Sequence, residues 1–133
     1  MKIILDTNVL ISGIFFDGNP GKILEQWRDG KLELILSEEI FKEYKDVCNR
    51  LHYKFPGIDI DEILELVFLN ARFYQPIKVK TPVTIDPDDD KFVKCALAGD
   101  VKIIISGDKH LLDVNGYQGI EVMTPSDFIE KYL

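Results

Sequence analysis

The sequence predicts one α/β domain built on a mainly parallel β-sheet. Short apolar runs rich in β-branched residues alternate with segments that have the apolar spacing of helices. A length of 133 residues is that of one ordinary domain, and 46% apolar with 29% charged residues is typical of a folded protein. Alternating strands and helices are joined by right-handed crossovers, so helices should cover both faces of the sheet. We therefore predict a single domain over residues 1–133.

Five short apolar runs are the predicted strands, and the first and fourth are the most strongly apolar. They are Ile3–Asp6, Leu32–Leu36, Ile77–Lys80, Val101–Ile105 and Ile120–Met123.

Five helices are predicted from their capping residues and from apolar residues at a period of 3.6. Most begin at Ser, Thr, Asp or Asn, and three have proline directly after that residue. They are Asn19–Gly30, Ser37–Leu51, Asp59–Phe73, Asp86–Gly99 and Thr124–Leu133. In the third helix, the predicted buried face consists of Ile63, Leu64, Val67, Phe68 and Ala71.

Composition also bears on location. No apolar run approaches the ~18 residues of a membrane span, and the first residues do not resemble a signal peptide. Cys48 and Cys95 both lie in apolar helical patterns, which is typical of core thiols in a reducing compartment. We expect a cytoplasmic protein with no membrane contact.

The formal net charge of −7, from 23 acidic and 16 basic residues, argues against a nucleic-acid partner. That argument weakens if several of the acids surround divalent cations, because a bound cation is then the largest local charge.

Two predicted strands each end in a carboxylate. The first strand leads to Asp6, and the fourth leads through Ser106 and Gly107 to Asp108. Ligands of open α/β sheets bind outside the carboxyl ends of the strands. Each aspartate could instead begin a turn or cap a helix, but two such acids after the two most apolar strands favour a site.

The segment Asp86–Asp90 has four acids in five residues. Asp86 suits a helix cap, and acids are favourable in a first helical turn. Four acids exceed that need, because their mutual repulsion requires a counter-charge. Asp90 lies at the border of the buried face of its helix, and Asp88 and Asp89 are surplus acids that could touch a second cation.

Glu43 lies at the margin of the apolar stripe of the second helix. A glutamate at such a margin is most often solvated, with its stem packed on the core. Together, Asp6, Glu43, Asp90 and Asp108 form an all-oxygen set. His52 and His110 have no ligand partner at i+3 or i+4, so a surface role is expected for both. A set of four carboxylates without histidine or cysteine favours Mg²⁺ or Mn²⁺ over zinc. It indicates hydrolysis or transfer of a phosphate ester.

Four motifs in this order resemble the PIN domain family. They are Ile4–Leu10 with Asp6, Ser37–Glu39 leading to Glu43, Asp90–Phe92 with Ala96, and Ile105–Asp108 with Leu111. The opening DTNVLISGIFF, followed by NPGKIL, is most similar to the VapC type of toxin from toxin–antitoxin pairs.

The resemblance implies a three-layer fold with a five-stranded parallel sheet of order 3-2-1-4-5. It also implies a Mg²⁺- or Mn²⁺-dependent endoribonuclease, often a homodimer, with an antitoxin partner that blocks the site. Asp6, Glu43, Asp90 and Asp108 occupy the acidic positions of the family and would be both catalytic and metal-binding. Asn8 and Ser106 occupy its supporting polar positions.

RNA-binding groups are less defined. Lys42, Lys45, Arg50 and Lys54 could line a phosphate track, although a solvated helix face explains them as well.

Three alternatives stay open. A receiver-like signalling domain would have an acid pair after the first strand, where this chain has one acid. A haloacid-dehalogenase-type phosphatase would have a second aspartate where Asn8 stands. The non-enzymatic alternative is a PIN fold kept as an RNA-binding or scaffold module.

Overall fold

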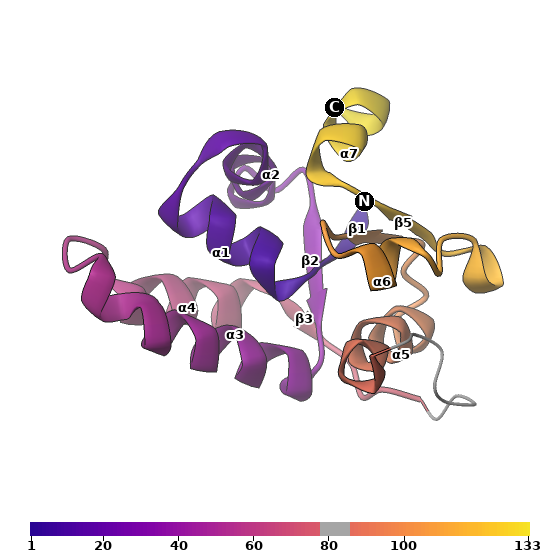
Figure 1. Ribbon diagram of the computed structural model, residues 1–133, viewed down its shortest axis with the longest axis horizontal. Coiled ribbons are helices and arrows are strands. Elements are labelled where there is room, and N and C mark those ends of the chain that lie inside the picture. Colours follow the sequence, from indigo (N-terminus) through magenta and orange to yellow (C-terminus); the bar gives the residue numbers. More distant parts are fainter. Residues whose placement is uncertain (78–85) are drawn as a thin grey trace.

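A computed structural model describes residues 1–77 and 86–133, and its centre is a five-stranded parallel sheet of order β3-β2-β1-β4-β5 (Figure 1). The strands are β1 (Lys2–Leu5), β2 (Glu33–Leu36), β3 (Arg72–Phe73), β4 (Ile103–Ile105) and β5 (Glu121–Met123). The helices are α1 (Thr7–Phe15), α2 (Gly18–Arg28), α3 (Glu38–Leu51), α4 (Ile60–Asn70), α5 (Asp90–Ala98), α6 (Lys109–Leu112) and α7 (Pro125–Tyr132).

The predicted α/β class and sheet order are confirmed. Helices α1 to α4 lie on one side of the sheet and α5 on the other, which makes three layers (Figure 1). The order 3-2-1-4-5 also differs from the order 2-1-3-4-5 of receiver domains, so the receiver-like alternative is wrong.

The centre of the sheet is apolar and fully buried. β1 pairs with β4 in parallel, with Ile4 opposite Ile104 and Leu5 opposite Ile105. These residues, and most of those around them in the main core cluster, have almost no exposed surface. Strands buried on both faces are expected to be continuous apolar runs rather than alternating ones, as β1 and β4 are.

Helix α3 is attached to the end of β1 by a buried hydrogen bond. The Tyr44 hydroxyl donates to the carbonyl oxygen of Leu5 at 2.5 Å, and Tyr44 is fully buried. The N-terminal cap of α3 is the predicted one, because the Ser37 hydroxyl accepts from the Ile40 amide at 3.3 Å. The hydrogen bond of Tyr44 therefore holds α3 beside Asp6, the residue that follows Leu5.

The predicted cysteine environment is also confirmed. Cys48 and Cys95 are both buried and unpaired. Burial raises the pKa of the Cys48 thiol to about 11 and that of the Cys95 thiol to about 12, so both stay protonated and act as small core residues.

Two helices were not predicted, α1 and the short α6. α1 begins directly after Asp6, and its sequence TNVLISGIF is apolar almost throughout. Such a sequence has no polar stripe, so its periodicity does not distinguish a buried helix from a strand or loop. Next to it, α2 begins at Gly18 rather than after Asn19, because Asp17 and Gly18 both have positive φ and turn the chain sharply.

The predicted helix Asp59–Phe73 is too long. Asp59 caps it as expected, since its side chain accepts from the Glu62 amide, but α4 ends at Asn70. The chain then forms β3, where Phe73 pairs with Leu36. Residues 78–80 of the predicted third strand lie outside the described ranges. Phe68, predicted to be buried, is 55% exposed.

None of the helices in residues 1–77 and 86–133 is both long and apolar enough to cross a membrane.

Candidate active site

Asp6 and Asp108 meet at the carboxyl edge of the sheet, and one serine connects them. The Ser106 hydroxyl donates to Asp6 Oδ2 at 2.6 Å and accepts from the Asp108 amide at 2.9 Å. Pairing of β1 with β4 brings these residues together, because the Asp6 amide donates to the Ile105 carbonyl at 2.9 Å. Ser106 is fully buried and Asp6 nearly so.

The capping alternative applies to Asp108 but not to Asp6. Asp108 Oδ1 accepts from the His110 amide at 2.8 Å, so this carboxylate does cap the short helix α6. Asp6 makes no side-chain capping bond to α1. Although Asp6 directly precedes α1, its carboxylate accepts from the Ser106 hydroxyl and so belongs to the acidic cluster.

A group of three ligand atoms that could hold a cation lies beside this pair. Asp89, Asp108 and His110 each offer one atom, and these atoms lie within 4.8 Å of one another. His110 was expected to have a surface role, and that expectation is incomplete. The cap at Asp108 turns the chain so that His110, two residues on, comes back to the carboxylates, with Nδ1 4.0 Å from Asp108 Oδ1.

Asp89 has an unsatisfied oxygen. Within the described part of the chain, Asp89 Oδ2 is the one buried side-chain oxygen or nitrogen without a hydrogen-bond partner. Burial raises the pKa of Asp89 to about 6, and repulsion from Asp108, Asp6 and Asp86 adds to this, while Lys91 opposes it. Burial likewise raises the pKa of Asp6, against the hydrogen bond from Ser106. A cation would relieve both costs.

Glu43 is held by two neighbours that the sequence did not assign to the site. One of its oxygens accepts from the Thr7 hydroxyl, and the other lies 2.7 Å from Lys91 Nζ. Glu43 is therefore not simply solvated. Burial by itself lowers the pKa of Lys91, but the hydrogen bond to Glu43 and the charges of nearby carboxylates outweigh it, so that the pKa is raised and Lys91 stays charged.

The other acids of the segment Asp86–Asp90 take different positions. Asp86 caps the 3₁₀ turn Pro87–Asp89 by accepting from the Asp88 amide at 3.0 Å, so the predicted capping role is confirmed. The Asp88 side chain is largely exposed. Asp90 begins α5 and is buried, but it is not in the three-residue group, and its role as a ligand stays a prediction.

The remaining predicted residues lie near the surface. Asn8 is exposed in the first turn of α1, and Arg50 and Lys54 are exposed near the end of α3. Lys42 and Lys45 line a hollow of about 610 Å³ that also includes Phe41, Phe68 and Phe73. Phe73 ends β3, so this hollow lies toward the same carboxyl edge as the acids.

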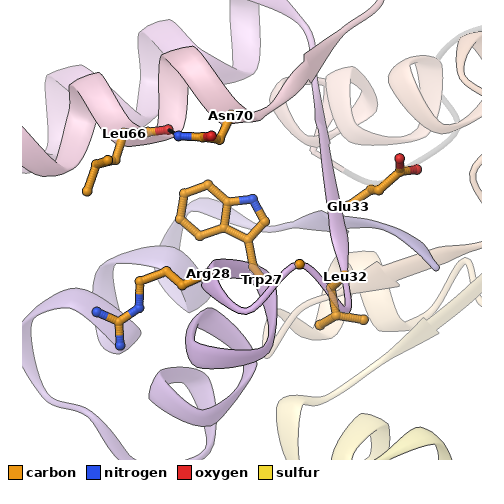
Figure 2. Close-up of a pocket in the computed structure, with 7 residues that line it drawn as sticks. Trp27, Arg28, Leu32, Glu33, Leu66 and Asn70 are labelled. Atoms are coloured by element: carbon orange, nitrogen blue, oxygen red, sulfur yellow. Dashed lines mark hydrogen bonds between the residues drawn. The ribbon is translucent and has the colours of Figure 1, made fainter.

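A second hollow, of about 540 Å³, lies away from this edge. Figure 2 shows the Trp27 indole of α2 directed toward Leu66 and Asn70 of α4, with Glu33 at the start of β2. Because Glu33 begins its strand, this hollow lies near the amino end of β2. Arg28 and Glu33 are its charged residues, so it lacks the cluster of carboxylates that phosphate-ester chemistry with a divalent cation requires.

Comparison with known families separates the PIN fold from the haloacid-dehalogenase-type alternative. The sequence profile of a family described as the PIN domain matches residues 2–110, which include the sheet-edge acids. The chain belongs to the PIN domain family. No curated protein sequence matches it.

PIN domains are commonly nucleases and usually bind a divalent metal, so membership supports a nuclease in general terms and implies a nucleic-acid partner. The residues fit a cation, since Asp89 Oδ2 is buried and unpartnered beside Asp108. His110 changes the expected ligand chemistry, because imidazole is a more usual ligand of transition metals than of Mg²⁺. The spacing Asp-x-His after a buried strand is the signal that could have identified it.

The raised pKa of Asp89 predicts how pH affects the metal-free protein. Burial keeps the pKa of the Asp89 carboxyl at about 6 in the folded protein, whereas the ordinary pKa of an aspartate is 3.8. The folded state therefore binds more protons between these values, and the free energy of unfolding should fall as pH rises through them. In the presence of a chelator, Asp89→Asn should remove this fall in the free energy of unfolding. The variant should then be more stable than the original protein by about 1 kcal/mol at pH 7.5.

Urea denaturation at pH 4.5 and 7.5 measures this difference. Asp113→Asn, at an exposed aspartate, is the control and should leave the pH dependence unchanged. A stability difference between Asp89→Asn and the original protein that does not grow with pH would contradict the account.

Proposed function

We propose that this chain is a divalent-cation-dependent endoribonuclease whose site is the carboxyl edge of β1 and β4. The observation that carries the proposal is a group of ligand atoms from Asp89, Asp108 and His110 within 4.8 Å of one another, where Asp89 Oδ2 is buried and has no hydrogen-bond partner among the described residues. Asp6 lies near enough to this group to raise the pKa of Asp89 by repulsion. Acids packed this closely repel one another, and the fold keeps them together without an equal number of basic residues. Such an arrangement is expected where a cation and a phosphate ester are to be bound.

We propose a role for each side chain of the site. Asp89, Asp108 and His110 would hold the cation, and Asp6, oriented by Ser106, faces the same space. We keep Asp90 as a further ligand and Asn8 as a supporting polar group, as the resemblance implies. When bound, Mn²⁺ or Mg²⁺ supplies a Lewis acid that lowers the pKa of water and stabilises charge on the phosphate.

Lys42 and Lys45 support an RNA substrate. Both are exposed and lie next to the rings of Phe41, Phe68 and Phe73, whose centroids are 5.5 to 5.8 Å apart. Lysines beside exposed aromatic rings suit a single strand, since the lysines contact phosphates and bases stack on rings. We propose that RNA runs from this hollow to the acids, and that Arg50 is a weaker contact.

The biological role that we propose is that of the toxin of a toxin–antitoxin pair. The opening segment that resembles VapC toxins contributes Asp6 and Thr7 to the site and continues into α1 and α2. A protein antitoxin would cover the acids. We further propose that the domain extends over residues 1–133, because β5 pairs with β4 and α7 contacts α2. Two protonated core thiols suit a cytoplasmic location.

The activity is tested with single-stranded RNA and Mn²⁺. The original protein should cleave internally, and Asp6→Asn should lower the rate by at least about 100-fold, because one carboxylate facing the cation is lost. Asp46→Asn, the same change at an exposed acid of α3, should leave the rate unchanged. Cleavage in excess chelator, or full activity of Asp6→Asn, would contradict the proposal, and no cleavage by the original protein with Mn²⁺ would favour a non-catalytic PIN module.

We also propose a homodimer through the outer face of α4. Leu66 and Leu69 lie one turn apart on this helix and are 45% and 66% exposed, and neither lines the hollow that we propose for RNA. Leu69→Glu should convert a dimer into a monomer on size-exclusion chromatography with light scattering. Tyr53→Glu, at an exposed tyrosine outside α4, should not. A monomeric original protein at about 50 μM would contradict this assembly.

A further inference from the structure

Lys91 is a cation that the chain itself places within the acidic cluster. Its side chain is 6% exposed, and it is the one buried basic residue in residues 1–77 and 86–133. Nζ lies 2.7 Å from Glu43 Oε1, donates to the Asp88 carbonyl at 2.8 Å and lies 3.8 Å from Asp88 Oδ1. A charged side chain is buried only where partners of this kind compensate for lost hydration.

This contact determines what Glu43 can bind. One carboxylate oxygen faces Lys91 and the other accepts from the Thr7 hydroxyl, which is itself buried. Direct coordination of a divalent ion by Glu43 would therefore require one of these contacts to break. A buried ion pair that loses one partner leaves an uncompensated charge, which is costly.

The group that could hold a cation lies elsewhere in the cluster. It is formed by Asp89, Asp108 and His110, and Glu43 is not a member. The acidic cluster thus has two parts. Among residues 1–77 and 86–133, the carboxylates of Asp89 and Asp108 have no ammonium partner at ion-pair distance, whereas Glu43 has Lys91.

We propose that the Lys91 ammonium permanently occupies the Glu43 part of the cluster, so that each chain binds one divalent cation rather than two. Glu43 is then a positioning residue that connects α1, α3 and α5 through Thr7 and Lys91, and it is not a metal ligand. The inference rests on the proposed metal-dependent function, and it narrows the predicted ligand set.

The test is to count bound Mn²⁺ by electron paramagnetic resonance of the free ion during a titration at pH 7.5. The original protein should bind one Mn²⁺ per chain. Lys91→Met removes the ammonium at similar side-chain volume and should bind two, since Glu43 and the Asp88 carbonyl become available. Lys94→Met, the same change one turn further along α5, is the matched control and should bind one, as should Lys91→Arg.

Glu43→Gln makes the test independent of whether Lys91→Met folds. It should still bind one Mn²⁺, with an affinity within about tenfold of the original, because only a neighbouring charge is lost. Loss of Mn²⁺ binding in Glu43→Gln, two ions in the original protein, or one ion in a folded Lys91→Met would each overturn the inference. No Mn²⁺ bound by the original protein at millimolar concentration would instead overturn the proposed function itself.

Discussion

The site depends on the hydrogen bonds of Ser106, which join the ends of the two central strands. Pairing of β1 with β4 places Asp6 and Ser106 side by side, and the serine hydroxyl then contacts both Asp6 and the Asp108 amide. Two carboxylates that follow neighbouring buried strands cannot move apart without disrupting the centre of the sheet. Their mutual repulsion is therefore a fixed property of the fold, and the surrounding residues compensate for it.

Compensation takes two forms. On the side of α3 and α5, Lys91 and Thr7 neutralise and orient Glu43 within the protein. On the side of α6, the described residues place His110 beside Asp89 and Asp108 but no ammonium at ion-pair distance, and they leave one buried oxygen of Asp89 without a hydrogen-bond partner. In our proposal, the second side is the part of the cluster that takes up a cation from outside. This division also explains part of the net charge of −7, since acids that surround a cation need not repel RNA.

Sequence reasoning could find residues whose position follows from a strand end or a helix cap. Asp6 and Asp108 follow apolar strands, and Ser37, Asp59, Asp86 and Thr124 cap the elements that begin after them. It could not find α1, because a helix that is apolar nearly all round lacks the stripe that defines a period. The short β3 was also missed, since two residues carry too little pattern to be distinguished from the end of α4.

Contacts between segments that are distant in the sequence were harder to predict than strand ends and helix caps. Thr7, Glu43 and Lys91 come from three helices, and nothing in their spacing shows that they meet. The sequence also does not show that Tyr44 connects two elements, yet its hydroxyl donates to the Leu5 carbonyl and attaches α3 to the end of β1. For His110, the i+3 and i+4 rule for helical ligands does not apply, because the chain returns through a capped turn instead.

The central claim, that one cation binds between α6 and the turn before α5, is tested most directly by anomalous diffraction from crystals soaked in Mn²⁺. The account predicts one peak per chain, within about 2.5 Å of an oxygen of Asp89 and one of Asp108. Lys91 should still contact Glu43 in the same crystals. A peak coordinated by Glu43, or a peak only in the hollow lined by Trp27 and Leu66, would contradict it.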